Sequence, residues 1–422
     1  MPCQNSDVRV LIVTSGSMGD VAPYTGLGAG LRDAGHEVTV AAHESFRPVF
    51  AAAALPFEPL PGDMRAILPQ ARGQDGRTSG TGPRALARLL RIARPVIEEL
   101  GDGIVAAVRR ARPEAILLST VVAPLGYQVA EAAGVPWAGV FLQPVEPTRE
   151  FGSVLLGGRS IGPWGNRTIT AAAAFVSQSL YAGPVQHLRR SLGLPHQPIR
   201  TLRTWQDGGR YPSFHGFSPS VVPRPSDWRP QLEVVGYWWP AARPGWQPPA
   251  ELRDFLAAGP PPVFVGFGSM APGQGDRLAG TVRAAVHRAG VRAVVQTGWA
   301  GLRVSSDEVL TIGEAPHDWL LPRMAAAVHH AGAGTTAAAL RAGLPAVPVP
   351  VLADQPFWAG RVHRLGAATR PIPFSRLTTD RLAAALRQVT AEGRLAARAR
   401  VLAARLATED GTARIAAWLD DL

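Results

Sequence analysis

The stretch Val328–Gly343 reads VHHAGAGTTAAALRAG, an apolar run followed by a glycine-rich turn and an alanine-rich segment. The turn, Ala331–Gly334, lets the backbone approach another group closely, because glycine has no side chain and tolerates positive φ. Thr335 and Thr336 stand where an N-cap stands, and they predict a helix over Ala337–Ala342. The stretch therefore predicts a turn that feeds directly into a helix.

The same turn is a candidate anion site. A glycine-rich turn at a helix N-terminus presents free N–H groups and the positive end of the helix dipole, which together favour phosphate or diphosphate. His330 adds a polar ring beside the turn, and Gly332 and Gly334 leave room for a ligand. An ordinary turn with a threonine cap explains the glycines and threonines without a ligand, but it gives His330 no role.

Short apolar runs alternate with helical segments on both sides of this stretch. Met324–Val328, directly before it, fits a buried strand or the end of a helix. Strands are predicted at Arg9–Thr14, Glu37–Ala42, Glu114–Thr120, Trp137–Leu142, Val263–Gly266, Ala293–Gln296, Val309–Ile312 and Ala346–Val351. Helices are predicted at Val21–Ala34, Leu125–Ala133, Arg277–Ala289, Pro356–Leu365 and within Thr379–Leu422. This order is typical of parallel, doubly wound sheets.

At 422 residues the chain is too long for one hydrophobic core and suits two domains of about 200 residues each. The alternation fades between Gln143 and Val222, and Pro240–Pro262 is proline-rich, as expected of an interdomain connection. We expect an α/β protein with two doubly wound, Rossmann-like domains that face a cleft. The expected divisions are an N-terminal domain (1–225), a linker (226–262), a C-terminal domain (263–400) and a last helix (401–422) that can pack back on the N-terminal domain.

The net charge of +11 comes from 43 basic residues, all of them arginine. These arginines are scattered along predicted helices without an interleaved aromatic platform, which favours solvated helix faces over a nucleic-acid site. The positive field can still attract an anionic small substrate.

Several classes of protein are disfavoured by the termini and by the cysteine content. No window reaches the roughly 18 apolar residues of a membrane span, and the N-terminus lacks the basic segment and cleavage site of a signal peptide. The single cysteine, Cys3, excludes a disulfide framework and a cysteine metal site. We expect a cytoplasmic protein.

The motifs of other phosphate-binding and metal-binding enzymes are missing. GLGAGL (Gly26–Leu31) falls inside a predicted helix and lacks the GxGxxG spacing of a dinucleotide fold, and a chain without lysine has no Walker motif. No DxD pair is present for a metal-bound diphosphate, and the histidines show no HxxxH or HExxH spacing. We therefore expect phosphate binding without a metal and without a cofactor.

Three segments carry a resemblance to a known family: GSMGDVAPYTGLGAGLRDAGHEVTVAAH (16–43), EAPHDWLLPRMAAAVHHAGAGTTAAALRAG (314–343) and PVPVLADQPFWAGRVHRLG (348–366). They look like the two-domain glycosyltransferases of the GT-B fold, in the branch that acts on sterols, polyketides and glycopeptide antibiotics, with the sterol type nearest. The resemblance covers both ends of the chain, whereas the middle, residues 143–222, matches only in length.

The resemblance implies inverting transfer of a sugar from a nucleotide diphosphate donor to a hydroxyl acceptor. It places His330, Gly334 and Thr335 at the diphosphate, in agreement with the anion site, and Asp354 and Gln355 at the sugar hydroxyls. For these two, a helix N-cap at Asp354 before Pro356 is the alternative. It also places Gly268 and Ser269 along the donor cleft, and Ala315, His317 and Trp299 around the base. Core packing is the alternative for Trp299.

The chain departs from plant members of the family at two positions. Those members have Trp where this chain has Glu314, and a ribose-binding Glu where it has Ala338. Other groups must therefore hold the base and the ribose. Uridine and thymidine both remain open, with UDP-glucose as the favoured donor.

Asp20 is the predicted catalytic base. The sterol and glycopeptide branch has Gly-Asp at this point, as here, where many relatives have His. A carboxylate can take the proton of an acceptor hydroxyl as it attacks. A plain helix N-cap is the alternative, and the positive end of a helix dipole weakens a carboxylate as a base. If Asp20 is not the base, His36 and His43 are the next candidates.

The acceptor is expected to be an apolar molecule such as a sterol or a polyketide, with Phe141, Trp164 and Phe175 in the wall that holds it. Scattered aromatic residues are more often part of the core. A sugar-nucleotide epimerase, or a donor-binding auxiliary protein on the same fold, is the alternative function. We expect a monomer or a weak dimer.

Overall fold

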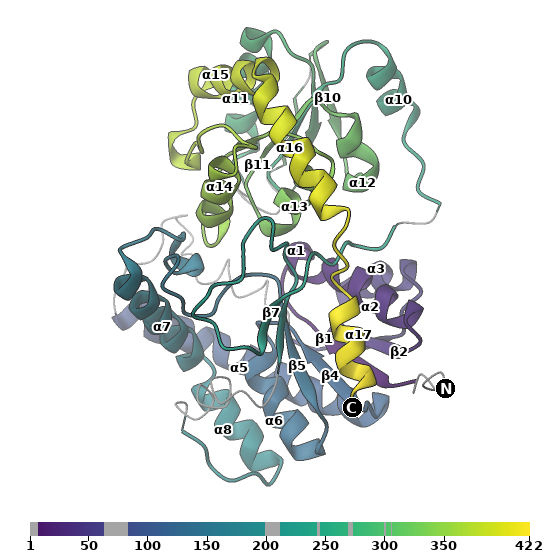
Figure 1. The fold of residues 1–422 in the computed structure, drawn as a ribbon, viewed down its shortest axis with the longest axis vertical. Coiled ribbons are helices and arrows are strands. Elements are labelled where there is room, and N and C mark those ends of the chain that lie inside the picture. Colours follow the sequence, from purple (N-terminus) through teal and green to yellow (C-terminus); the bar gives the residue numbers. More distant parts are fainter. Residues whose placement is uncertain are drawn as a thin grey trace.

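The computed structural model describes residues 7–62, 83–198, 212–242, 245–268, 273–298, 301–304 and 306–422, with only the backbone described for residues 83–92. Cys3, Ser269 and Trp299 lie outside the described residues. Within these ranges the chain forms two parallel sheets, one in each half of the molecule (Figure 1). The expected fold class is confirmed.

The N-terminal sheet has the strand order β3-β2-β1-β4-β5-β6-β7, and every neighbouring pair is parallel. Its strands read as continuous apolar runs because helices cover both faces, as in RVLIV of β1. The strands are β1 (Arg9–Val13), β2 (Glu37–His43), β3 (Phe57–Leu60), β4 (Ala115–Leu118), β5 (Trp137–Phe141), β6 (Ser213–His215) and β7 (Leu232–Val234). The helices are α1 (Met18–Val21), α2 (Pro23–Asp33), α3 (Arg47–Ala52), α5 (Pro83–Ala111), α6 (Ala123–Ala133), α7 (Pro163–Ser179) and α8 (Ala182–Ser191), with 3-10 turns η1 (Glu44–Phe46) and η3 (Val154–Leu156).

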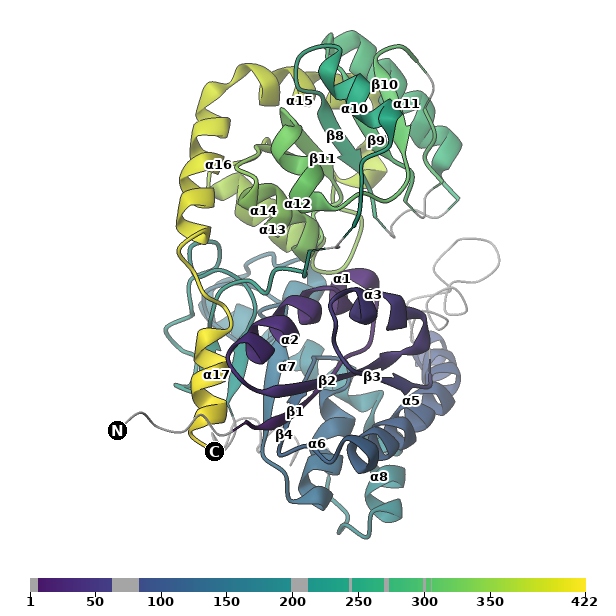
Figure 2. The same cartoon turned by 90° about the vertical axis from the view of Figure 1, so that its right-hand side faces the viewer.

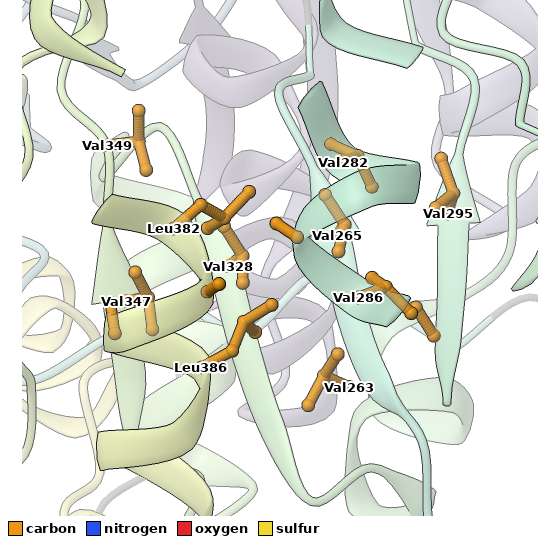
Figure 3. Close-up of a cluster of buried hydrophobic side chains, with 14 of the residues drawn as sticks. Val263, Val265, Val282, Val286, Val295, Val328, Val347, Val349, Leu382 and Leu386 are labelled. Atoms are coloured by element: carbon orange, nitrogen blue, oxygen red, sulfur yellow. The ribbon is translucent and has the colours of Figure 1, made fainter. Parts of the chain in front are cut away.

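The C-terminal sheet has the order β10-β9-β8-β11-β12, again parallel throughout. Valines of its strands pack against α11 and α15, where Val282, Val286, Leu382 and Leu386 fill the layer between helices and sheet (Figure 3). The strands are β8 (Val263–Gly266), β9 (Ala293–Gln296), β10 (Val309–Ile312), β11 (Ala326–His329) and β12 (Ala346–Pro348). The helices are α10 (Ala250–Ala257), α11 (Gly275–Ala289), α12 (His317–Leu320), α13 (Ala333–Arg341), α14 (Gln355–Arg364), α15 (Thr379–Ala391), α16 (Gly393–Leu406) and α17 (Ala413–Asp420), with 3-10 turns η4 (Leu321–Arg323) and η5 (Phe374–Arg376).

The chain returns to the N-terminal domain at its C-terminal end. Helix α16 descends from the C-terminal domain, and α17 lies beside α2 and β1 in both views (Figures 1 and 2). Ile415, Ala416 and Leu419 of α17 are buried in the core layer that also contains Val10 and Leu27. The last helix therefore belongs to the N-terminal core by packing.

The expected boundary at residue 225 is too early. β7 lies in the range assigned to the linker but completes the N-terminal sheet beside β6. The linker also packs against the rest of the protein. Trp238 is buried, and its Nε1 donates a hydrogen bond to Gly411 O at 2.9 Å. A side chain at Gly26 of α2 would collide with the carbonyl of Trp239, so the segment lies directly on that helix.

The fold brings the carboxyl ends of both sheets together. In Figures 1 and 2, α1, which follows β1, faces α13, which follows β11. Ligands of parallel α/β sheets bind at this edge of the strands. No helix in the described part of the chain is both long enough and apolar enough to cross a membrane.

Candidate active site

A cavity of about 1240 Å³ lies between the two domains. Its lining comes from both sheets, with Asp20 and Ser119 following β1 and β4, and Gly268 and His330 following β8 and β11. The predicted residues Ala315, His317, Gly332, Gly334, Thr335, Asp354, Gln355 and Phe141 also line it. Residues far apart in the sequence are thus brought into one site.

Helix α13 begins four residues earlier than predicted. Gly332 is its N-cap and the helix runs from Ala333, so Thr335 and Thr336 lie inside the first turn. The cap is a glycine without a side-chain hydrogen bond, and the prediction of a threonine cap is wrong. The earlier start places the amides of Ala333, Gly334 and Thr335, which have no intrahelical acceptor, on the cavity wall.

His330 is held against the backbone of two glycines. A side chain at Gly332 would collide with its Nε2, and one at Gly268, where φ is +56°, would lie 3.0 Å from its Cε1. Burial, followed by the proximity of His317, lowers the pKa of His330 to about 4. The ring is therefore neutral at pH 7, and its N–H group can donate a hydrogen bond without carrying a charge.

Asp20 lies in the first turn of α1, and its N-cap is Ser17 rather than Asp20 itself. Its Oδ2 accepts hydrogen bonds from Ser17 N at 2.9 Å and from Ser17 Oγ at 2.8 Å. Gly16 has φ of +137°, and a side chain there would lie 2.8 Å from the same Oδ2. Among the described residues Oδ1 has no hydrogen-bond donor, so one oxygen of this cavity-lining carboxylate is fixed by Ser17 and the other is not.

Asp354 occupies the N-cap position of α14, yet its carboxylate does not cap the helix. Its Oδ2 accepts from Trp358 Nε1 at 2.9 Å, and Trp358 is fully buried. Burial, and secondarily the charge of Asp20, raises the pKa of Asp354 to about 6. The two carboxylates, one from each domain, thus interact across the cavity.

Gln355 uses its amide oxygen within the protein. Its Oε1 accepts from Val351 N at 2.8 Å and from Leu352 N at 3.2 Å. Only its Nε2 group is left to donate to a ligand. The loop before α14 is thus braced by a residue of its own helix.

The chain matches known protein families at both ends. The family described as glycosyltransferase family 28 N-terminal domain matches residues 10–151, and the erythromycin biosynthesis protein CIII-like C-terminal domain matches residues 283–422. The O-mycaminosyltylonolide 6-deoxyallosyltransferase of Streptomyces fradiae is 38% identical over 96% of this chain and 95% of its own length.

The chain belongs to the GT-B glycosyltransferases.

Other relatives agree with this family. A sterol 3-beta-glucosyltransferase of Arabidopsis thaliana is 32% identical over 96% of the chain, and the chain spans 64% of that protein's length. A Streptomyces sp. SF2575 glycosyltransferase complexed with thymidine diphosphate superposes with a TM-score of 0.66 at 23% identity, covering 98% of this chain and all of that one. The glycotransferase of kitacinnamycin superposes with a TM-score of 0.72 at 20% identity, covering 99% of both chains.

The part of the glycosyltransferase cavity expected to hold the base lies in the C-terminal domain. Glu314, Ala315, His317 and Ala338 all line it. The His317 ring stands edge-on to Phe264, with ring centroids 5.7 Å apart.

Of the three aromatic residues predicted for the acceptor wall, only Phe141 lines the cavity. Trp164 is 72% exposed and lies under the Arg149 guanidinium, and Phe175 is 50% exposed. Neither is among the residues that line the cavity. The cavity face of α7 consists instead of Thr170, Ala174, Ser177 and Gln178. Small residues occur on several sides of α7, so their spacing in the sequence does not distinguish this face.

The linker supplies site residues that the sequence did not indicate. Tyr237, Trp238 and Trp239 line the cavity, and Arg341 of α13 lies over the Trp239 ring at 4.5 Å. Tyr24 and Ser119 also line it from the N-terminal domain. Within the described part of the chain, no group of three or more His, Cys, Asp or Glu side chains is placed to hold a metal ion.

Proposed function

We propose that this glycosyltransferase moves a hexose, with inversion, from a nucleoside diphosphate sugar to a hydroxyl group of an apolar natural product. The observation that carries the proposal is the position of Asp20 opposite the first turn of α13 and His330 in one cavity. A proton acceptor and an anion site therefore face the same space from different domains.

The proposed reaction assigns one role to each side of the cavity. The Asp20 carboxylate takes the proton of the acceptor hydroxyl as the oxygen attacks the anomeric carbon. The bond from that carbon to the diphosphate oxygen breaks, and the electron pair leaves with the nucleoside diphosphate. The amides of α13, the helix dipole and the neutral His330 ring stabilise the negative charge that grows on this leaving group.

The lining of the N-terminal half of the cavity supports an apolar acceptor. Pro48, Val121, Phe141, Leu142 and Val154 line it, together with the small residues of α7. An epimerase would need space for the donor alone, whereas this cavity extends well beyond the donor-binding edge of the C-terminal sheet. A macrolide aglycone or a sterol, the acceptor types in the names of the relatives, suits such a wall.

The purified protein should be incubated with UDP-glucose or dTDP-glucose and a panel of sterols, macrolide aglycones and simple apolar alcohols. Mass spectrometry should detect an acceptor that has gained one hexosyl unit. Interconversion of the nucleotide sugars without transfer would instead indicate an epimerase. Neither product from any pair, despite donor binding, would indicate an auxiliary role.

Activity is expected to survive EDTA. The α13 amides and His330 offer fixed donors at the proposed diphosphate position, so the leaving group does not depend on a cation there. Turnover should be compared before and after dialysis against EDTA, and after Mg²⁺ or Mn²⁺ is added back. Loss of turnover that only a divalent cation restores would overturn this assignment.

Asp354→Ala and Gln355→Ala should weaken selectivity for the donor sugar more than affinity for the nucleotide. The Asp354 carboxylate can accept from sugar hydroxyls and the Gln355 Nε2 group can donate to them, whereas neither is placed on the phosphate-binding turn. Because the pKa of Asp354 is about 6, its share of this selectivity should fade as the pH drops through 6 and the carboxylate gains a proton. The rates with UDP-glucose and UDP-galactose, and the Kd of UDP alone, measure both effects. Equally poor binding of UDP alone to both variants would show that the pair is misplaced.

A further inference from the structure

The last residue of β11, His329, is buried in the sheet and has no role in the proposed reaction. It pairs with Gly266 of β8 on one side and with Pro348 of β12 on the other. Its side chain is fully buried, and it is not among the residues that line the cavity. The three strand residues before it, Ala326–Val328, are apolar, so a polar ring at this point needs an explanation.

The explanation lies in a single hydrogen bond to the following turn. His329 Nδ1 accepts from the backbone N–H of Ala331 at 3.0 Å. An accepting Nδ1 requires a neutral ring with its proton on Nε2. Burial lowers the pKa of His329 to about 3, which is consistent with a neutral ring at pH 7. Among the described residues Nε2 has no hydrogen-bond partner, so the ring is retained despite one unsatisfied group.

Ala331 itself has an uncommon backbone conformation. Its φ is +61°, in the left-handed region that side chains disfavour, and it is fully buried. It lies directly before Gly332, the N-cap of α13. A local hydrogen bond from a side chain to the N–H two residues later is the pattern by which Asn and Asp stabilise tight turns.

The geometry points to His329 as a positioning residue: by accepting the Ala331 N–H, it holds the left-handed turn that directs the His330 ring and the first amides of α13 into the cavity. His330 depends on this turn closely, because its ring touches the position where a Gly332 side chain would be. A small rotation at Ala331 therefore moves both the ring and the N-terminus of the helix.

The second loop of the same domain is built in a similar way. Ala353, directly before Asp354, has φ of +56°. Here the Gln355 side chain accepts the N–H groups of Val351 and Leu352 and braces the turn. Both alanines thus lie in the left-handed region beside a cavity loop, and each is close to a side chain that accepts backbone N–H groups. The two turns are therefore stabilised in the same way, and each is followed by polar groups that line the cavity.

His329→Asn and His329→Leu form a matched pair for testing this role. Both side chains branch at Cγ and have the same number of heavy atoms, but only asparagine can accept the Ala331 N–H. We expect His329→Leu to weaken the binding of thymidine diphosphate and uridine diphosphate by about tenfold, and His329→Asn to stay within about threefold of the wild type. Adding Ala331→Gly to His329→Leu should recover most of the loss, because glycine adopts positive φ without help.

Hydrogen exchange in the protein without ligand supplies a second readout. It is needed because the measurement of nucleotide binding rests on the proposed function. Peptides that cover residues 330–340 should exchange faster in His329→Leu than in His329→Asn. Equal exchange and equal nucleotide binding in the two variants would overturn the positioning role. Failure of the wild type to bind either nucleotide would refute the proposed function, and the exchange comparison would still decide the role of His329.

Discussion

Replacing Asp20 by asparagine is expected to lower kcat by about 10²–10⁴, the usual contribution of a positioned proton acceptor, while the Kd of the donor nucleotide stays near that of the wild type. Asparagine keeps a side-chain oxygen that can accept from Ser17 N, so the first turn of α1 keeps its internal hydrogen bond. What it removes is the negative carboxylate of a residue that lines the cavity. Steady-state kinetics with a fixed acceptor, together with calorimetric titration of the nucleoside diphosphate, measure the two quantities.

Two control variants separate proton transfer from folding. Ser17→Ala removes one of the two donors to Asp20 but leaves the carboxylate, so its kcat should change far less than that of Asp20→Asn. Asp20→Ala should add a folding cost of about 1 kcal/mol through the lost contact with the N-cap residue, which thermal unfolding can measure. A folded Asp20→Asn protein with nearly normal transfer would exclude Asp20 as the base.

The structure places both fallback candidates for the base, His36 and His43, away from the cavity. His36 is buried beside Asp420 of α17, and His43 interacts with Ser45 at the end of β2. Neither is among the residues that line the cavity. Both fallback candidates named from the sequence are therefore unsuited to receive the acceptor proton, whereas Asp20 lies opposite the proposed diphosphate site.

The strands of the C-terminal sheet could be predicted from the sequence almost residue by residue. β8, β9 and β10 have the predicted bounds, because short apolar runs in a sheet covered on both faces end abruptly at polar or glycine residues. For Met324–Val328 the sequence left open a buried strand or the end of a helix, and the structure has a strand there, β11. The donor-side residues follow from this register, since each stands just after a strand that the sequence located.

The errors arise where tertiary structure overrides local preference. The sequence favours a threonine cap for α13, but the buried His329 ring stabilises an earlier turn at Ala331, and the helix starts at Ala333.

The preference of aromatic residues for buried sites suggested Trp164 and Phe175 as cavity walls. Helix α7 turns both outward, and no periodic pattern of aromatic residues marks which face meets the cavity. The linker residues Trp238 and Trp239 enter the site only because the chain crosses α2 at Gly26, a contact that sequence spacing does not show.

Removing the hydrogen-bond donor at His330 is expected to be the second most damaging change. His330→Leu should lower kcat/KM by about 10²–10³, the usual cost of losing one fixed donor to a growing negative charge. His330→Gln keeps an amide that can donate from a similar position and should lose less, by roughly tenfold. Both variants retain a side chain against Gly268 and Gly332, so the comparison isolates the donor from the packing of the turn.

The pH dependence distinguishes a neutral donor from a charged one. Because the pKa of His330 is about 4, the ring carries no charge near neutral pH, and wild-type affinity for a nucleoside diphosphate should not increase as the pH is lowered from about 8 to about 6. An imidazolium that formed on ligand binding would instead make binding tighten over that range, with uptake of a proton that calorimetry in two buffers can detect. A folded His330→Leu protein that keeps kcat/KM within tenfold of the wild type would leave stabilisation of the leaving group to the α13 amides alone. The neutral ring would then serve only to shape the turn between Gly268 and Gly332.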